Sequence, residues 1–566
     1  MKDGYNKLIF MNMKNITLNI TILFLSIFMI IGCKTPDDLT PSVSRQGINS
    51  ITAKFLNDES TDNAFTSEID YENGIIKIVF PYNYPRTSEN VLSVNDLKNL
   101  RVVANLDDNV SISPSILYMD FTKENIITVT DQKKVQKQYK VIADIRKNSD
   151  SKILEFNLLS NGLNGVINEE AKTISIVSIE DIIPSLSTLS LSHGAVISPD
   201  PRTQVLNYNQ EVKLTVTAQD GISTSVYTVK KNIPEKIELG LRTGSAKVLW
   251  AKKIQSDLGI SALHKTNGIS ATKDHIIINT QGENSIYLNS KTGAVEGRLN
   301  MSNIAGQYTN FYSTADDDDN ILISNLSPEA GSFKIWKIKG VASTPSLFLE
   351  YNGGQYLGRK FSIQGSIEKN AIITAPIAFN DNGNYFLRWQ VINGSLVSQT
   401  PQLVEAKITS SRWRDNSDVI YTSSTNLESD YFVAYYGTPY RMAWVDGKTH
   451  GLKGSGSEIS PNWIINAVDY KVFNNNPYVA HTTVNSFTWG SDDSVLLFDA
   501  NSTSSIVSPI WRAPVGTYGG KENGGQNAWG TSDVAIKVSE NGYYMYVYFL
   551  FTNGQVVCVQ FDCIKM

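Results

Sequence analysis

The sequence predicts an all-β protein in which two N-terminal Ig-like β-sandwich domains are followed by a β-propeller of six blades, with seven blades as the alternative. Three observations support this prediction. Short segments rich in β-branched and aromatic residues alternate with Gly, Asn, Asp and Pro turns, and helical periodicity is nearly absent. One pattern occurs twice between residues 50 and 232. A second pattern, with a period of about 45 to 65 residues, recurs about six times from residue 244 onward.

The chain begins with a segment that is predicted to direct export. An apolar core at residues 16–31 follows Lys14, and it is shorter than the roughly 20 residues that cross a bilayer. We therefore expect residues 1–32 to be a signal peptide. A bare transmembrane anchor is the alternative.

The end of this segment, residues 29–33 (MIIGC), resembles the lipobox of bacterial lipoproteins. In a lipobox the peptide is cut before the cysteine, and the cysteine thiol carries a diacylglycerol. The resemblance implies that Cys33 is lipidated and that residues 33–49 form a linker between the lipid and the first folded domain.

Composition excludes several classes of function. Hydrophobic residues make up 41% and charged residues 19% of the chain, as in packed globular proteins. The net charge of −5 and the lack of a basic block argue against nucleic-acid binding. Cys558 and Cys563 are separated by an odd number of positions, so on one strand they face opposite sides and are not expected to form a disulfide. The five histidines are scattered singly, and we expect neither a metal nor a cofactor.

Residues 50–147 and 148–233 are predicted to be the two Ig-like domains. Residues 69–78 of the first resemble residues 167–176 of the second, and each domain closes on an alternating strand. The short strands and regular turns are typical of a β-sandwich. Neither domain contains the cysteine pair or the tryptophan core of an antibody domain.

Two kinds of strand repeat along residues 244–566, the predicted propeller. The first is a short apolar strand after a polar turn, as at residues 276–278, and the second is an alternating strand further on, as at residues 286–288. Four short strands in each of about six repeats are typical of a β-propeller. Residues 248–251 precede the first full repeat. We expect this strand to pair into the last blade, because that pairing removes the open edge of the ring.

The loops that lead into the innermost strand of each blade are expected to line one mouth of the central channel. Aromatic residues occur in four of these six loops, beside Asn, Gln, Arg or Lys. This composition suits a sugar, whose C–H face packs on an aromatic ring and whose hydroxyl groups bind amides and guanidinium groups. A structural place between blades is the alternative for the aromatic residues. The candidate ligand-binding residues are Tyr308, Asn310, Tyr356, Arg359, Trp463, Asn466, Asn527 and Trp529.

No catalytic residue is predicted, because the sequence shows no nucleophile elbow, no readable carboxylate pair and no metal triad. Acids and bases on separate blades would escape such a search. The acidic run at residues 316–319 offers oxygen ligands for calcium, but it lacks the DxDxDG pattern, and a solvated turn is the favoured interpretation.

The order of lipobox, tandem Ig-like domains and C-terminal propeller resembles surface lipoproteins of Bacteroides-type bacteria, including those that accompany Sus-like glycan uptake systems. Asp37 and Asp38, soon after the cysteine, are similar to the export signal of such lipoproteins. The resemblance implies an outer-membrane, lipid-anchored protein, exposed on the cell surface beside a transporter partner. It also implies that the propeller mouth binds glycan without enzymatic turnover. The alternatives are a propeller glycoside hydrolase or polysaccharide lyase, and a protein-interaction or adhesion module.

The lipobox interpretation predicts the effect of replacing Cys33. The Cys33→Ser protein should fail to incorporate radioactive palmitate in cells, because serine offers no thiol for the lipid. Cys558→Ser is the matched control and should label like the wild type. Palmitate incorporation by the Cys33→Ser protein would contradict the interpretation.

Overall fold

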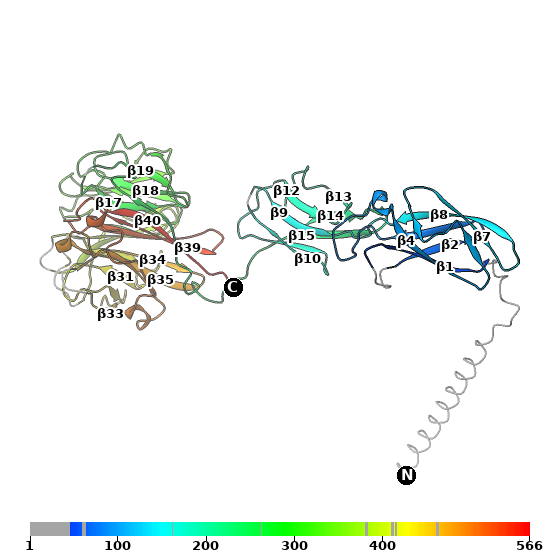
Figure 1. Cartoon of the computed structure of the whole chain (residues 1–566). Coiled ribbons are helices and arrows are strands. Elements are labelled where there is room, and N and C mark those ends of the chain that lie inside the picture. Colours follow the sequence, from blue (N-terminus) through cyan, green and yellow to red (C-terminus); the bar gives the residue numbers. More distant parts are fainter. Residues whose placement is uncertain are drawn as a thin grey trace, which may run out of the picture. The chain divides into compact units, whose positions relative to one another are not determined.

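The computed structural model describes residues 46–58, 64–160, 162–261, 263–379, 383–408, 413, 416–459 and 463–566. The predicted signal peptide, Cys33 and the linker as far as residue 45 lie outside the described residues. The chain divides into two compact units, Met1–Asn232 and Ile233–Met566 (Figure 1). No helix in the described part of the chain combines the length and the apolar character needed to span a bilayer.

The all-β prediction is confirmed. The helical elements among the described residues are single turns of 3-10 helix. They are η3 (Val94–Leu97), η4 (Ser486–Thr488), η5 (Ser505–Val507) and η6 (Lys521–Asn523).

The first part of unit 1 is a sheet of eight strands in the order β5-β7-β8-β3-β2-β1-β4-β6. β3 and β8 are parallel, and the other neighbouring strands are antiparallel. Ile51 and Val102 from one end of the sheet share a core with Ile76 and Val141 from the other end. The two ends of the sheet therefore pack against each other. The strands are β1 (Ile48–Phe55), β2 (Phe65–Asp70), β3 (Ile75–Phe80), β4 (Leu100–Leu106), β5 (Ser111–Ser113), β6 (Tyr118–Met119), β7 (Asn125–Thr130) and β8 (Gln136–Ile145).

The second part of unit 1 repeats this plan in smaller form. A five-stranded sheet, β10-β11-β15-β14-β13, faces the pair β12-β9 across a core that includes Phe156, Tyr208 and Tyr227. β11 runs parallel to β15, as β3 does to β8. The strands are β9 (Ile153–Leu158), β10 (Gly165–Asn168), β11 (Thr173–Val177), β12 (Ser187–Leu191), β13 (Val196–Ser198), β14 (Val212–Thr217) and β15 (Thr224–Asn232).

Unit 2 consists, over its described residues, of six antiparallel sheets that resemble propeller blades. Five have four strands, and the third has five because β27 pairs with both β28 and β29. In chain order the first three sheets contain β17 (Thr266–Ala271), β18 (His275–Thr280), β19 (Ile286–Asn289) and β20 (Val295–Arg298); β21 (Tyr312–Ala315), β22 (Asn320–Ser324), β23 (Phe333–Lys339) and β24 (Ser346–Tyr351); and β25 (Ser362–Gly365), β26 (Ala371–Pro376), β27 (Tyr385–Ile392), β28 (Ser395–Leu396) and β29 (Gln402–Glu405).

The last three sheets complete the unit. They contain β30 (Asp418–Tyr421), β31 (Tyr431–Ala434), β32 (Ala443–Val445) and β33 (Leu452–Ser455); β34 (Trp463–Phe473), β35 (Asn476–Asn485), β36 (Ser494–Asp499) and β37 (Trp511–Arg512); and β38 (Ser532–Val538), β39 (Tyr544–Phe551), β40 (Gln555–Asp562) and β16 (Lys247–Lys253).

The six sheets close a ring. The first strand of each sheet lies beside the first strand of the next, in the cycle β17, β21, β25, β30, β34, β38 and back to β17. β16, from the start of the unit, pairs with β40 at the end of the chain, with Trp250 opposite Cys558. The expected pairing of residues 248–251 with the last sheet is therefore confirmed.

The continuous apolar runs that mark the repeat are explained by burial on both faces of each sheet. Ile276, Ile277 and Ile278 of β18 are all fully buried. Ile276 and Ile278 pack in one core beside the last sheet, whereas Ile277 packs in another beside the second sheet. Successive strand residues point to opposite faces, so a strand enclosed between two sheets needs apolar residues at every position.

Trp250 is predicted to be essential to the closure of the ring. Its side chain is buried, its indole N–H donates to the carbonyl of Ser290 at 2.9 Å, and its ring lies against Gly293 in the first sheet. We expect Trp250→Ala to lower the free energy of unfolding by about 3–5 kcal/mol in chemical denaturation. Val248→Ala, at a half-exposed position of the same strand, should cost about 0.5 kcal/mol. Equal losses in the two variants would contradict this role.

Candidate ligand-binding site at one mouth of the ring

Strand pairing shows which loops gather at each end of the ring. The first residue of the innermost strand lies opposite the last residue of the second strand, as Thr266 lies opposite Thr280 and Tyr312 opposite Ser324. The loop before each innermost strand and the loop after each second strand therefore share one end. We call this end the pocket mouth and the other end the acidic mouth.

A cavity of about 300 Å³ opens at the pocket mouth. Its polar side chains include the amides of Asn267 and Gln281, for which the described residues provide no side-chain hydrogen bond. Its volume lies at the lower end of the range for small-molecule sites. The lining residues are Leu263, His264, Lys265, Asn267, Gln281, Tyr308, Phe311, Leu326, Arg359, Lys360, Asn416, Trp529 and Thr531.

Arg359 is held among aromatic rings rather than by a carboxylate. Its guanidinium carbon lies 5.8 Å from the ring centre of Phe311 and 5.4 Å from that of Phe379. Tyr356 packs edge-on against Phe379, with ring centres 5.1 Å apart. The guanidinium Nε is buried without a hydrogen-bond partner among the described residues. These contacts position the cation, and no described residue takes up its hydrogen-bonding capacity.

His264 connects two loops of the pocket. Its backbone N–H donates to Asn553 Oδ1 at 2.9 Å, and its Nδ1 lies 3.2 Å from Asn553 Nδ2. Its ring meets Trp529 edge-on, with centres 6.2 Å apart. Burial lowers the pKa of His264 below its usual value, so the imidazole is neutral at neutral pH.

The floor of the pocket is a buried ion pair. The ammonium of Lys360 donates to Asp533 Oδ1 at 3.0 Å and to the carbonyl of Ser532 at 2.5 Å, and both charged side chains are 2% exposed. Tyr312 donates its hydroxyl to the same carboxylate oxygen at 2.9 Å. The charge of Lys360 is therefore neutralised within the protein.

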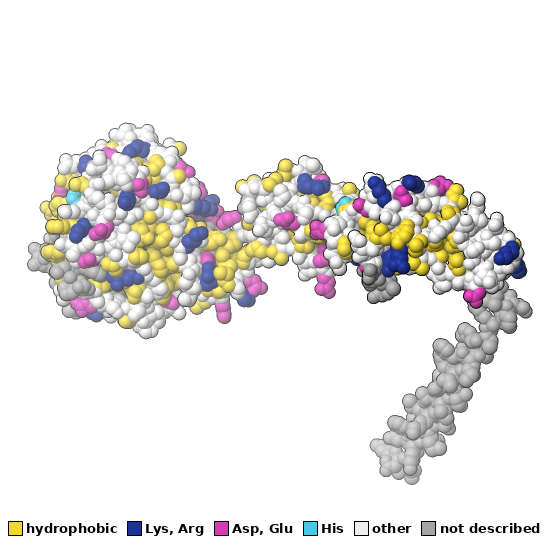
Figure 2. All heavy atoms as spheres, in the orientation of Figure 1, with side chains coloured by type: hydrophobic (Ala, Val, Ile, Leu, Met, Phe, Trp, Pro, Cys, Tyr) yellow, Lys and Arg dark blue, Asp and Glu magenta, His cyan; other side chains and the backbone are white. Residues whose placement is uncertain are grey.

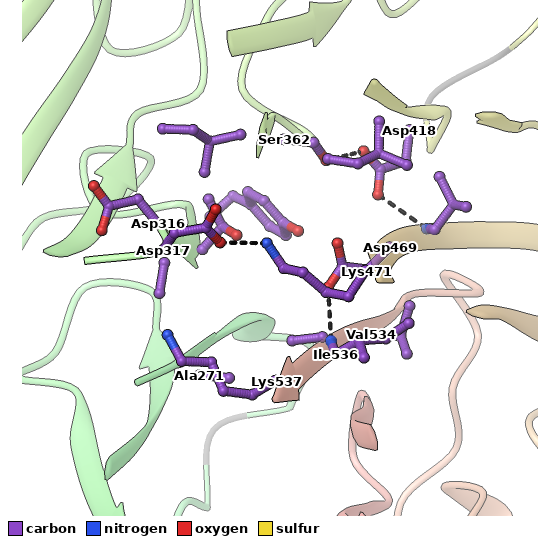
Figure 3. A pocket seen from close by; sticks show the side chains of 17 residues that line it. Ala271, Asp316, Asp317, Ser362, Asp418, Asp469, Lys471, Val534, Ile536 and Lys537 are labelled. Atoms are coloured by element: carbon purple, nitrogen blue, oxygen red, sulfur yellow. Dashed lines mark hydrogen bonds and ion pairs between the residues drawn. The ribbon is translucent and has the colours of Figure 1, made fainter. Parts of the chain in front are cut away.

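Beneath this floor, carboxylates of the innermost strands join neighbouring sheets (Figure 3). Asp418 of β30 accepts from the N–H of Val468 in β34 at 3.1 Å, and Asp469 of β34 accepts from that of Ile536 in β38 at 2.6 Å. Asp533 of β38 accepts from the N–H of Ile269 in β17 at 2.8 Å. The cavity here is about 30 Å³, which holds one or two water molecules.

Burial raises the pKa of all three carboxyl groups. For Asp469 the value rises to about 6, because desolvation outweighs the opposing effect of Lys471 and of the backbone N–H donors.

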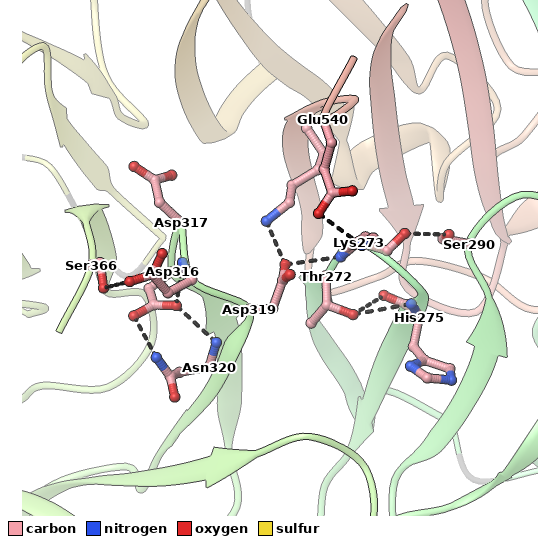
Figure 4. Close-up of polar contacts among 12 residues, drawn as sticks. Thr272, Lys273, His275, Ser290, Asp316, Asp317, Asp319, Asn320, Ser366 and Glu540 are labelled. Carbon is pink, nitrogen blue, oxygen red and sulfur yellow. Dashed lines mark hydrogen bonds and ion pairs between the residues drawn. The ribbon is translucent and has the colours of Figure 1, made fainter. Parts of the chain in front are cut away.

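The acidic run at residues 316–319 forms the β21–β22 turn at the acidic mouth (Figure 4). Asp317 pairs with Lys471, Asp318 binds Lys369 at 2.9 Å, and Asp319 binds Lys537 at 2.6 Å. The three lysines come from three other sheets, so three of the four carboxylates are paired within the protein, and Asp316 accepts from Asn320 and from the N–H of Ile367. Within the described residues, no group of three His, Cys, Asp or Glu side chains is arranged to hold a metal ion.

Comparison with known families assigns the ring-forming unit to a family. Residues 252–562, more than half of the chain, match the family described as Domain of unknown function (DUF8500). The chain belongs to the DUF8500 family. Residues 28–143 match Domain of unknown function DUF5018, and residues 153–231 match Domain of unknown function DUF8499. No curated protein matches the sequence.

Solved structures include distant likenesses to this DUF8500 protein. A DUF4623 family protein from Bacteroides eggerthii DSM 20697 is 18% identical with a TM-score of 0.44, over 74% of this chain and 99% of that one. A gluconolactonase from Xanthomonas campestris is 9% identical with a TM-score of 0.32, over 58% of this chain and 94% of that one. Both TM-scores are below 0.5 and both sequence identities are below 25%.

Three of the residues predicted from the sequence line the pocket of the DUF8500 unit: Tyr308, Arg359 and Trp529. Tyr356 lies beside it through Phe379. Trp463 begins β34, and its side chain is outside the described residues.

Three predicted amides are instead buried within the protein. Asn310 holds the loop after β18 by donating to the carbonyls of Thr280 and Glu283. Asn466 accepts from the N–H and hydroxyl of Ser532, and Asn527 bonds both ways with the backbone of Thr531. These side chains shape the loops and do not face the cavity.

Sequence reasoning missed a second set of loops at the pocket mouth. Phe379, Phe487 and Trp489, all exposed, follow the second strands β26 and β35, and therefore share this end of the ring. His264, Lys265, Asn267 and Gln281 also line the cavity. A search of the loops that follow the second strand of each repeat would have found the three aromatic residues.

The raised pKa of Asp469 predicts a pH dependence of stability. Its folded pKa of about 6 exceeds the ordinary value of 3.8, so the unfolded chain ionises first as the pH rises. This group's contribution to the free energy of unfolding therefore falls between about pH 4 and 6 and then levels off. Asp469→Asn removes the titration. We expect its stability relative to wild type to improve by about 1 kcal/mol from about pH 5 to pH 7 in denaturant titrations.

Asp446→Asn is the control for this measurement. The exposed turn carboxylate of Asp446 has its pKa lowered, first by the backbone N–H of Thr449, so its contribution is lost only at more acidic pH. The difference between this variant and wild type should stay constant from about pH 5 to pH 7. The same behaviour in Asp469→Asn would contradict the assignment.

Proposed function

We propose that this protein is a lipid-anchored protein of the bacterial outer-membrane surface that binds glycan at the pocket mouth of a six-bladed β-propeller and does not cleave it. Two Ig-like domains in unit 1 act as a spacer between the lipid on Cys33 and the propeller. A transporter in the outer membrane is the proposed partner that receives the captured glycan.

The observation that carries this proposal is the composition of the pocket. Trp529 is 62% exposed although it is large and apolar, and it stands at a concave site that also holds Tyr308. Asn267 and Gln281 supply amide groups that no described side chain or backbone group occupies. Exposed rings next to free amides match the apolar face and the hydroxyl groups of a sugar.

The lining also favours binding over hydrolysis. Glycoside hydrolysis ordinarily requires a pair of carboxyl groups about the scissile bond. The described residues that line the cavity include neither Asp nor Glu. Asp533 lies at the floor, but it is buried and bound by Lys360 and Tyr312. The described lining therefore offers the hydrolase alternative no acid and base at this site.

Polysaccharide lysis is the second candidate, because a neutral imidazole at His264 and the hydroxyl of Tyr308 line the same cavity as Arg359. A lyase removes the proton next to a uronate carboxyl group with such a base. Release of unsaturated, ultraviolet-absorbing products from the glycans bound would favour it.

Trp529→Ala and Tyr308→Ala should weaken glycan binding. The loss of one stacked ring costs about 1 kcal/mol, or roughly fivefold in affinity, and more where the ring is covered by the sugar. Binding is measured by affinity electrophoresis and calorimetry of the full chain on a panel of plant and host polysaccharides. Tyr118→Ala is the control, because Tyr118 is an exposed ring in unit 1.

Three outcomes are informative. Binding that both pocket variants weaken and Tyr118→Ala leaves unchanged supports the proposal. Binding unaffected by either pocket variant places the glycan elsewhere and contradicts it. No binding to any glycan, with retention of a membrane protein in pull-down experiments, favours an adhesion or protein-interaction role instead.

A further inference from the structure

The pocket mouth carries two cationic side chains, Arg359 and Lys265, that no carboxylate among the described residues neutralises. Arg359 makes no hydrogen bond or ion pair with any described residue, and its Nε is buried without a partner. Lys265 also lines the cavity, and its exposed ammonium has no partner among the described residues. Lys360, in contrast, is paired with Asp533.

The acidic mouth differs from the pocket mouth, because its lysines are paired with carboxylates. There the lysines at positions 369, 471 and 537 each meet a carboxylate of the turn at 316–319. On the face of unit 2 that Figure 2 shows, cationic and anionic side chains are likewise interspersed. The described loops at the pocket mouth also contain carboxylates, including Glu283, Glu329, Asp492, Asp493 and Glu522, but none of these lines the cavity.

The aromatic rings around Arg359 fix the position of its guanidinium group. Rings at 5.8 Å and 5.4 Å from its guanidinium carbon hold the group by cation–π contacts and partly exclude water. A guanidinium held in this way loses little conformational entropy when it binds an anion, and its planar fork of N–H donors matches a carboxylate or sulfate. An uncompensated cation in a partly desolvated cavity is costly unless a ligand anion pairs with it.

We propose that the pocket selects acidic oligosaccharides, whose carboxylate or sulfate group binds Arg359 and Lys265 while a sugar ring packs on Trp529. This inference rests on the proposed glycan binding and specifies its substrate class. Arg359 provides the paired hydrogen bonds, and Lys265 adds an exposed point charge. The amides of Asn267 and Gln281 are available to the hydroxyl groups of the same sugar.

The test compares acidic oligosaccharides with neutral forms of the same chains. Calorimetry of the full chain uses oligogalacturonate and its carboxyl-reduced form, and chondroitin sulfate oligosaccharide and its desulfated form. The first pair isolates a carboxylate, and the second isolates a sulfate. We expect at least one acidic form to bind roughly tenfold or more tightly than its neutral counterpart, with the preference decreasing as salt is raised.

Variants of the two cations assign the selectivity. Arg359→Gln should reduce affinity for the acidic form roughly ten- to hundredfold and leave the neutral form little changed. Arg359→Lys keeps the positive charge but loses the planar fork of N–H donors. Its affinity for the acidic form should therefore lie between those of wild type and Arg359→Gln. Lys265→Gln, at an exposed position that does not threaten folding, should show a smaller selective loss.

Lys291→Gln is the control, because Lys291 is exposed in the β19–β20 turn at the opposite end of the first sheet. It should bind like wild type. Equal affinity for acidic and neutral forms would overturn the inference and leave glycan binding intact. Selectivity that survives both Arg359→Gln and Lys265→Gln would overturn it too. Absence of binding to every oligosaccharide would overturn both proposals.

Discussion

Hydrogen bonds from backbone N–H groups to carboxylates across sheet boundaries are the interaction on which the ring depends. An innermost strand pairs with only one neighbour in its own sheet, so its other edge faces the channel without a strand partner. Asp418, Asp469 and Asp533 satisfy such N–H groups on the next sheet around the ring. Burial raises their pKa values, which is the cost of this arrangement. The hydrogen bond from Lys360 to Asp533, the charge of Lys360 near Asp418 and the charge of Lys471 near Asp469 oppose this effect.

This network also determines where a ligand can bind. It fills the centre of the ring to within a volume of one or two waters, and the ion-paired turn at 316–319 occupies the acidic mouth. The cavity at the pocket mouth remains the larger concave space near the ring axis in the described structure. Lys360 links the two regions, because Asp533 fixes it from below and its neighbour Arg359 lines the cavity above.

The fold of unit 2 could be predicted from the sequence because each of its sheets packs between two others and therefore repeats the same apolar pattern. Runs such as residues 276–278 are apolar at every position, since they are covered by sheets on both sides. The isolated strand at 248–251 had no partner in its own repeat, and ring closure supplies one. The site was only partly readable. Trp529 and Asn527 share one loop. The indole of Trp529 faces solvent, whereas the side-chain amide of Asn527 closes a turn by bonding to the backbone of Thr531.

By itself, the sequence determined the all-β class, the repeats and the loops that could form a mouth, because periodicity and turn residues are local properties of the chain. Only the tertiary structure decided which side chains meet there. Whether Arg359 is paired or free depends on residues from other sheets, and the pairing of each aspartate at 317–319 with a distant lysine depends on the closed ring. Electrostatic partners are chosen by distance in space, which the order of residues along the chain does not specify.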